Sequence, residues 1–333
     1  MGNRKQQITD VVMIGIVAII LIISMFIPTQ KSKGIIYPPS LKPGDKVAIL
    51  APAGPIAPEP VESAAIVLRN LGYEPVIYPT SYGKHGYFSA PHDERFADLK
   101  AAFTDPDIRA ILCARGGYGV ALILDSLATI PVENDPKWVI GFSDISALHA
   151  FMASRNIASI HASMAKQMAL GPDNADNATL ISILEGKFPK YTFTASPFNH
   201  IGKAEGRLLG GNLAVIQALI NTPYDIIHPE TILFIEDVSE PIYKIERIIY
   251  QLRMSGILSR LKGLIIGQFT EYESDSIHQT MEEMIAKALA DYPRLPVAFD
   301  VPVGHVDHNV PFVESAWATL DITPTEVTLT LEK

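Results

Sequence analysis

The sequence predicts an α/β protein with an N-terminal domain built on a parallel sheet, a smaller C-terminal β-rich α/β domain, and a hydrophobic helix ahead of both. From Lys46 onward, short apolar runs alternate with segments of helical periodicity, which is typical of parallel strands joined by crossover helices. Several of these runs end in glycine-containing turns. The hydrophobic helix is predicted from residues 11–27, which carry no charge.

Residues 1–35 are predicted to anchor the chain in a membrane. As a helix, the uncharged stretch would span about 25 Å, at the short end of what crosses a bilayer. A cleaved signal peptide is the alternative, but bulky side chains occupy positions 25–27, where a signal peptidase needs small ones. The sequence therefore predicts a single-pass protein whose main body lies outside the cytoplasm, with a cytoplasmic body as the alternative.

Residues 40–170 are predicted to form the first domain. Its first helix is indicated by Val61, Ala64 and Leu68, which share one face, and by Gly72, where a helix would stop. Its strands are predicted from mainly apolar runs at residues 46–52, 74–78, 108–114 and 138–141. The other helices are predicted near residues 96–103, 120–127 and 145–155.

Residues 171–204 contain several Pro and Asn residues and are predicted to be a connector with one helix. Residues 205–333 are predicted to form the second domain. Its turn at Gly210 to Asn212 is expected to start a helix, and Pro241 is expected to start another. Its strands are predicted at residues 231–236, 263–267, 296–299, 316–322 and 327–331.

The composition excludes several classes of protein. The formal charge of −9 and the pI near 5.5 argue against a nucleic-acid partner, because no basic surface is implied. The single cysteine, Cys113, excludes an internal disulfide framework and a cysteine-rich zinc site. Since Cys113 stands in an apolar run, it is expected to be a small buried core residue.

The sharpest local signal is the run VIGFSD, which ends with Ser143 and Asp144. An apolar strand runs into a turn with Ser143 at its tip, and a helix follows. In parallel sheets such strand ends line the ligand crevice, and the helix supplies backbone N–H groups for a developing oxyanion. The spacing is not G-x-S-x-G, because Ile145 replaces the second glycine. From this fragment alone, a simple helix N-cap is the alternative.

The run RGGYG, from Arg115 to Gly119, also follows a predicted buried strand. Its three glycines would let the backbone approach a ligand closely. A phosphate loop is the alternative, but the Walker lysine and its Ser or Thr are missing. Alone, this run is a weak signal for a binding site.

An acid and a histidine complete the candidate set. Glu236 ends the apolar run LFIE, where a carboxylate could face a crevice or simply be solvated. His305 follows a glycine in the run VGHVDH and could act as a general base near neutral pH. A metal site made of His305, Asp307 and His308 is the alternative. Because these residues stand on a Gly- and Pro-rich loop, no metal is predicted.

In this order, the motifs RGGYG, GFSD, LLGGNL, LFIED and VGH resemble the LD-carboxypeptidase family, which also holds the microcin C self-immunity peptidases. The resemblance covers most of the chain, from about residue 46 to residue 331. It implies that Ser143 is the nucleophile, Glu236 the acid and His305 the base of a catalytic triad. It also implies an α/β domain followed by a smaller β-rich domain, a site between them, and a homodimer.

The resemblance further implies a serine carboxypeptidase that cleaves the amide between an L-centre and the terminal D-alanine of a peptidoglycan stem tetrapeptide, without a metal or organic cofactor. The backbone N–H of Asp144, with that of Gly116 or Gly117, would bind the oxyanion. Arg115 and Tyr118 would contact the substrate. Cleavage of peptidyl-nucleotide antibiotics and inert murein binding are the alternatives.

Overall fold

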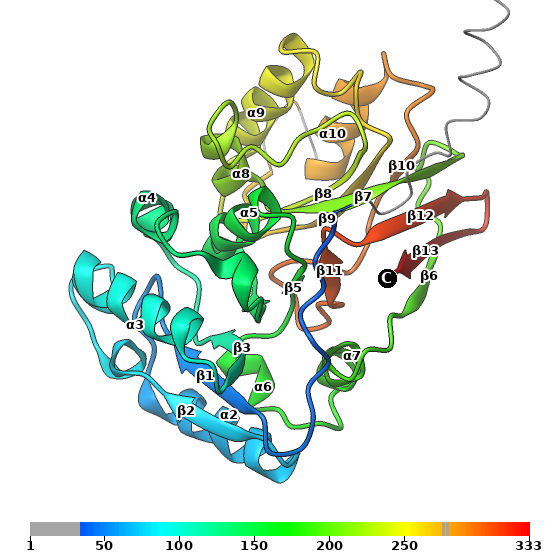
Figure 1. Ribbon diagram of the computed structural model, residues 1–333. Coiled ribbons are helices and arrows are strands. Elements are labelled where there is room, and N and C mark those ends of the chain that lie inside the picture. Colours follow the sequence, from blue (N-terminus) through cyan, green and yellow to red (C-terminus); the bar gives the residue numbers. More distant parts are fainter. Residues whose placement is uncertain (1–33, 275–276, 278–279) are drawn as a thin grey trace, which may run out of the picture. The chain divides into compact units, whose positions relative to one another are not determined.

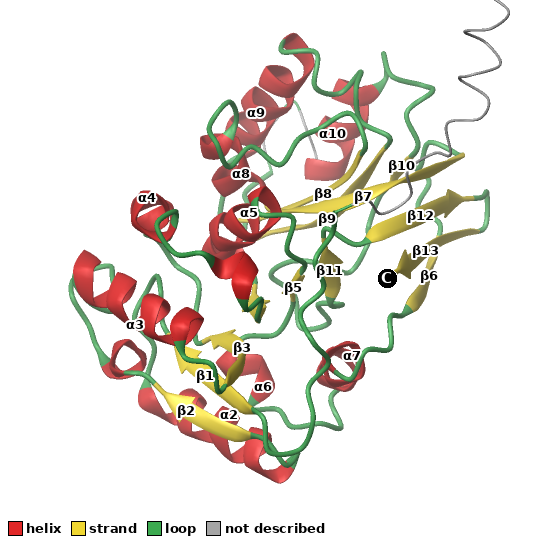
Figure 2. Ribbon diagram, viewed as in Figure 1, coloured by secondary structure: helices red, strands yellow, loops and turns green. Residues whose placement is uncertain are grey.

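The computed structural model describes residues 34–274, 277 and 280–333 of the chain. These residues fold into a mixed α/β structure with a six-stranded and a seven-stranded sheet, whose strands are yellow in Figure 2. The α/β class predicted from the sequence is confirmed. The predicted hydrophobic helix at residues 11–27 lies outside the described residues, so the structure gives that element no support.

The first sheet contains β1 (Lys46–Leu50), β2 (Glu74–Ile77), β3 (Ile108–Cys113), β4 (Trp138–Gly141), β5 (Ser159–His161) and β11 (Phe312–Glu314). The order in space is β11-β5-β4-β3-β1-β2, and only β11 runs antiparallel to its neighbour. Alternate residues of β1 belong to two different core clusters, which explains why the strand is an unbroken apolar run.

Helices cover both faces of this sheet. Val47 shares a core cluster with the buried face of α2 (Pro58–Asn70), and Ala48 shares the other with α3 (His92–Thr104). The further helices are α4 (Leu124–Leu127), α5 (Ser146–Ser154), α6 (Ala165–Met168) and α7 (Ala175–Leu184). The 3₁₀ turns are η1 (Pro79–Tyr82), η2 (Ala121–Ile123), η3 (Val132–Asn134) and η4 (Ser143–Ile145).

The second sheet contains β6 (Lys190–Thr194), β7 (Gly202–Asn212), β8 (Thr231–Val238), β9 (Gly263–Thr270), β10 (Val297–Ala298), β12 (Trp317–Ile322) and β13 (Glu326–Glu332). Its order is β10-β9-β8-β7-β12-β13-β6. The strands from β7 to β10 pair in parallel, and the rest pair antiparallel. Its helices are α8 (Leu213–Leu219), α9 (Ile242–Met254) and α10 (Met281–Leu289), and α9 packs beside α10 (Figure 1).

Several elements differ from the prediction. The run from Gly210 to Asn212 starts a helix as predicted, since Asn212 is the N-cap of α8, but it is the end of the long strand β7 and not a turn. Gly210 allows close packing of β8, because a Cβ there would lie 2.0 Å from the carbonyl oxygen of Phe234. The short strands β5, β6 and β11 and the helix α10 were not predicted, and the predicted helix 120–127 is divided into η2 and α4. The domain boundaries stay a prediction.

The predicted single-pass membrane anchor and the location drawn from it are corrected. Within residues 34–274, 277 and 280–333, no helix has the length and apolar character needed to cross a bilayer. The segment on which the prediction rested is not among these residues. The anchored enzyme with an extracytoplasmic body is therefore not retained.

Candidate active site

Ser143 is the first residue of η4, in the turn that follows β4, at the tip predicted from the sequence. Its φ is 68°, in the left-handed region that residues other than glycine seldom adopt. The turn is tight, since a Cβ on Gly141 would lie 3.0 Å from the side chain of Ile145. Such a backbone costs about 1–3 kcal/mol and is common at functional sites. The turn thus holds a half-buried serine just before helix α5.

The glycine loop of residues 115–119 packs directly on this serine. A Cβ on Gly116 would lie 2.7 Å from Cβ and 2.9 Å from Oγ of Ser143, and 3.3 Å from the backbone nitrogen of Asp144. The carboxylate of Asp144 accepts a 2.9 Å hydrogen bond from the backbone N–H of Val120, directly after the loop. The backbone of Gly116 and that of Asp144 therefore lie beside the Ser143 hydroxyl.

Arg95 holds the glycine loop in place, and sequence reasoning missed this role. Its Nη1 donates to the backbone oxygens of Pro52 at 2.7 Å and Gly119 at 2.9 Å. Burial lowers the pKa of Arg95, and the nearby Asp144 carboxylate opposes that shift. A signal was present in the sequence: Arg95 stands four positions before Leu99, on the buried face of α3, where a charged side chain is rare unless it is bonded.

His305 and Glu236 form the central polar contact of the site. Nδ1 of His305 lies 2.7 Å from Oε2 of Glu236, which is fully buried in β8. Burial raises the pKa of Glu236, and its hydrogen bond to His305 opposes this. Burial lowers the pKa of His305, but the hydrogen bond and charge of Glu236 outweigh it, so the pKa of His305 is raised. The buried acid thus stabilises the imidazolium form of His305, and because Nδ1 faces Glu236, Nε2 is the ring nitrogen left for proton transfer.

Phe142 connects the histidine to the serine turn. Its ring lies edge-on to the imidazole of His305, with 5.0 Å between centroids, and Phe142 directly precedes Ser143. Gly304, with φ 129°, leaves room for the acid, because a Cβ there would lie 2.8 Å from Cβ of Glu236. The structure therefore brings the Ser143 turn, Glu236 and His305 into one region.

The other histidine of this loop makes a different contact. Nδ1 of His308 lies 2.7 Å from Oδ1 of Asp176, so His305 and His308 face different carboxylates. In the part of the chain that the structure describes, no three His, Cys, Asp or Glu side chains are grouped to hold a metal ion. The loop geometry favours a base role for His305 over shared metal coordination with His308.

Asn212 links the second sheet to helix α5 close to the serine. Its backbone N–H donates to Oγ of Ser146 at 2.9 Å, and its Nδ2 donates to Oδ1 of Asp237 at 2.8 Å. Its Oδ1 caps α8 by accepting the N–H of Val215. Gly211 admits no side chain, since a Cβ would lie 2.3 Å from Oγ of Ser146. The LLGGNL motif is therefore a packed joint between β7 and α5 as well as a helix start.

A cavity of about 460 Å³ opens beside Ser143. The residues that face it include Gly117, Tyr118, Ser143, Asp144, Asn212 and Asp237. Tyr118 is half exposed and stacks on Phe88, with 5.6 Å between ring centroids. Arg115 is not in the wall of this cavity, and its Nη1 donates to the backbone oxygen of Pro55 at 2.6 Å. Of the two predicted substrate contacts, Tyr118 is thus the one that borders the cavity.

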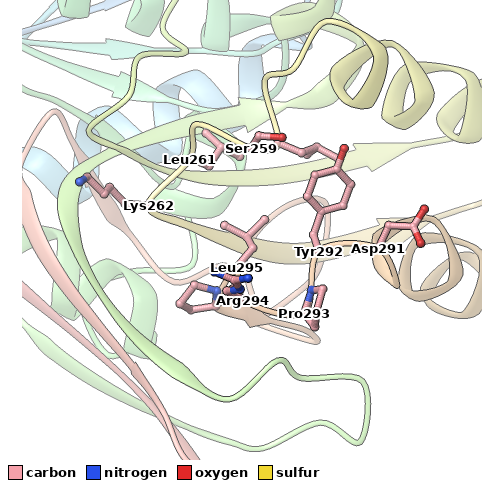
Figure 3. Close-up of a pocket in the computed structure, with 10 residues that line it drawn as sticks. Ser259, Leu261, Lys262, Asp291, Tyr292, Pro293, Arg294 and Leu295 are labelled. Atoms are coloured by element: carbon pink, nitrogen blue, oxygen red, sulfur yellow. The ribbon is translucent and has the colours of Figure 1, made fainter.

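A second hollow of about 470 Å³ lies away from these residues. Its wall includes Tyr292, Pro293 and Leu295, drawn in Figure 3, and Lys262, which precedes β9. None of the predicted site residues borders it. Ligands of parallel α/β sheets bind at the carboxyl ends of the strands, whereas this hollow lies at the amino ends of β9 and β10. We therefore place the candidate active site at Ser143.

Replacing Gly116 with alanine is expected to lower turnover by about 100-fold. The new methyl group must displace either the Ser143 hydroxyl or the glycine loop. A displacement of about 1 Å in a catalytic group lowers the rate by about this factor. Initial rates and thermal unfolding midpoints measure it. The matched control is Gly263→Ala, whose Cβ would lie 3.1 Å from that of Ala204 in β7. That crowding should lower stability and leave turnover unchanged. Equal losses of turnover in both variants would contradict the assignment.

Two family models match the chain: the LD-carboxypeptidase N-terminal domain over residues 47–162 and the C-terminal domain over residues 205–320. A Bacillus subtilis protein named as a probable murein peptide carboxypeptidase is 34% identical over 264 residues, covering 75% of this chain and 82% of that protein. The murein tetrapeptide carboxypeptidase of Pseudomonas aeruginosa is 30% identical over 276 residues, covering 79% of this chain and 89% of that protein.

Solved structures show the same fold. Muramoyltetrapeptide carboxypeptidase from Oxalobacter formigenes is similar with a TM-score of 0.77 and 27% identity, covering 86% of this chain and 99% of that one. A microcin C7 self immunity protein shares the fold with a TM-score of 0.78 and 20% identity, covering 90% of this chain and 99% of that one. With both family models matched and relatives at 30% identity or more, this carboxypeptidase belongs to the LD-carboxypeptidase family.

Proposed function

We propose that this enzyme releases the terminal D-alanine of murein tetrapeptide through a triad of Ser143, Glu236 and His305 and an acyl-enzyme intermediate. The observation that carries the proposal is the 2.7 Å contact between Nδ1 of His305 and Oε2 of the fully buried Glu236. The strained Ser143 turn beside a cavity supports it. The names of the relatives from Pseudomonas aeruginosa and Oxalobacter formigenes support the substrate.

In the first half of the proposed reaction, Oγ of Ser143 attacks the carbonyl carbon of the scissile amide while Nε2 of His305 takes its proton. Glu236 holds the imidazole tautomer through Nδ1 and stabilises the cation. The backbone N–H of Asp144, with that of Gly116 or Gly117, accommodates the oxyanion. His305 then gives its proton to the leaving nitrogen, the C–N bond breaks, and D-alanine departs.

In the second half, His305 takes a proton from water, which attacks the ester carbonyl of the acyl-enzyme. The C–O bond to Ser143 breaks, the serine recovers its proton, and the shortened peptide leaves as a carboxylate. Tyr118 is proposed to contact the substrate at the cavity wall. A contact of Arg115 with a substrate carboxylate and the homodimer stay predictions.

The pH dependence of kcat/KM should report the proposed base. Activity requires a neutral His305, so kcat/KM should fall as the pH drops through the pKa of His305. Because Glu236 raises that pKa, the fall should be centred above the ordinary histidine value of about 6.5. Rates from pH 5 to 9 test this, and the centre should move down in Glu236→Gln if enough activity remains. A wild-type centre well below 6.5 would contradict the assignment.

The direct test of the proposed function uses two synthetic murein tetrapeptides that differ only in ending with D-alanine or L-alanine. Mass spectrometry should detect free alanine and the tripeptide from the D-form alone. No release from either peptide would overturn the proposed substrate. Cleavage of a peptidyl adenylate analogue in that case would favour the antibiotic alternative, and binding of murein without any cleavage would favour an inert murein-binding protein.

A further inference from the structure

The loop that carries His305 is held by a residue from a distant part of the chain. Asp176 stands in the first turn of α7 and is 5% exposed, so it is a buried acid. Its Oδ2 accepts the backbone N–H of Asn309 at 2.9 Å, and its Oδ1 lies 2.7 Å from Nδ1 of His308. Both partners belong to the loop that follows β10. The Asp176 carboxylate therefore bonds to two adjacent residues of this loop, His308 and Asn309.

A further hydrogen bond connects Asn309 to Gly304, the residue before His305. Oδ1 of Asn309 accepts the backbone N–H of Gly304 at 2.9 Å, and this bond is buried. Gly304 also packs directly against the side chain of Glu236, since a Cβ at this position would lie 2.8 Å from Cβ of Glu236. The path from Asp176 through Asn309 to Gly304 thus ends one residue before the imidazole, where the loop meets the acid.

Helix α7 is itself fixed to the first sheet. Nδ2 of Asn177 donates to the backbone oxygens of Gln167 and Gly171 at 2.9 Å each. Leu180 of α7 shares a core cluster with Val61 and Leu68 of α2. The backbone N–H of Leu41 donates to Leu184 at the end of α7 at 2.8 Å. Asp176, whose carboxylate bonds to the His305 loop, therefore belongs to a helix that packs on the same part of the molecule as Ser143.

We infer that Asp176 is a positioning residue that holds the His305 loop at a fixed place relative to the Ser143 turn. The inference rests on the proposed role of His305 as the base. A buried carboxylate is costly unless it is fully bonded, and here both oxygens are engaged by the loop. Loss of these two bonds would let the His305 imidazole move away from Ser143 and from Glu236. The residues that line the cavity beside Ser143 would stay in place.

Asp176→Ala is the main test, with Asp176→Asn as the conservative variant. In Asp176→Ala, kcat should fall by about 100-fold with KM changed less than about threefold, because a drift near 1 Å has this effect on rate. Asp176→Asn keeps an oxygen for the N–H of Asn309 and should recover most of the loss. The matched control is Asp173→Ala, an exposed acid just before the same helix, which should behave as wild type.

A second variant and a substrate-independent measurement complete the test. If Asp176→Ala fails to fold, Asn309→Ala removes only the acceptor for Gly304 and should give the same kcat loss. NMR titration of labelled histidines, with His305→Gln for assignment, reports the contact with Glu236 whatever the substrate. The pKa of His305 should move down from its raised wild-type position in Asp176→Ala.

Two outcomes would overturn the inference. One is an Asp176→Ala protein that loses thermal stability but keeps the wild-type kcat and the wild-type His305 titration, which marks a merely structural acid. The other is an Asp176→Asn protein no better than Asp176→Ala. If the wild type releases no D-alanine, the proposed function fails, and the titration still decides whether Asp176 positions the loop.

Discussion

Ser143→Ala is expected to lower kcat/KM for murein tetrapeptide by about four orders of magnitude or more while the protein stays folded. The substitution removes the only atom proposed to form a covalent bond to the substrate and leaves the packing of the turn almost unchanged. Since φ at Ser143 is 68°, both serine and alanine incur the cost of the left-handed conformation, so the free energy of unfolding should change little. Single-turnover rates and the thermal midpoint separate the two effects.

The control for this prediction is Ser154→Ala, which removes a hydroxyl from the far end of α5, where its Oγ bonds to the backbone oxygen of Phe151. Its activity should equal that of the wild type. Combining Ser143→Ala with His305→Ala should cost little beyond either change, because residues of a triad act as a unit. Near-normal rates in Ser143→Ala would end the triad proposal, and full inhibition by a chelator would point to a metal hydrolase.

Glu236→Gln should lower kcat by about three to four orders of magnitude, as expected for the orienting acid of a triad. The buried carboxylate is the group 2.7 Å from Nδ1 of His305, and an amide of the same shape can neither fix the same tautomer nor stabilise the imidazolium. Steady-state rates at a pH well above the His305 transition measure the loss.

Glu271→Gln is the matched control, because Glu271 is an exposed acid whose charge also acts on His305. Removing that exposed charge should change kcat by only a few-fold, since solvent screens it. A Glu236→Gln protein within tenfold of wild type would show that the buried acid is not part of the mechanism. So would a Glu271→Gln variant as impaired as Glu236→Gln.

The parts of the fold that follow from periodicity could be predicted, and the parts that depend on long-range pairing could not. An apolar strand, a tight turn and a helix place Ser143 from local sequence alone. Short strands such as β5 and β11 are held by their neighbours in the sheet, since β5 pairs with β4 and with β11, which follows it about 150 residues later in the chain. No local sequence pattern therefore indicates them. Gly210 was read as a turn residue although it makes room for the backbone of a neighbouring strand.

The candidate site likewise contains residues that could be predicted from the sequence and residues that only the fold shows. Glu236 and His305 stand 69 residues apart, so their pairing came from the family resemblance and not from spacing. The residues that hold the loops of the site, Arg95 and Asp176, were not predicted, because the local sequence around each is typical of an exposed charged residue. Arg95 reads as a helix surface residue, and Asp176 reads as a solvated acid in a polar connector. Only the fold shows that both are buried and bonded to the loops around the site.

The central claim, that Ser143 carries the acyl group, is tested most directly with a tetrapeptide analogue whose terminal amide is replaced by a D-lactate ester. Acylation by an ester is fast, so the acyl-enzyme should accumulate before water resolves it. After an acid quench, mass spectrometry of the digested protein should find the tripeptidyl group as an ester on Ser143, and Ser143→Ala should release no D-lactate. Release of D-lactate at the wild-type rate by Ser143→Ala, or the acyl group on another residue, would contradict it.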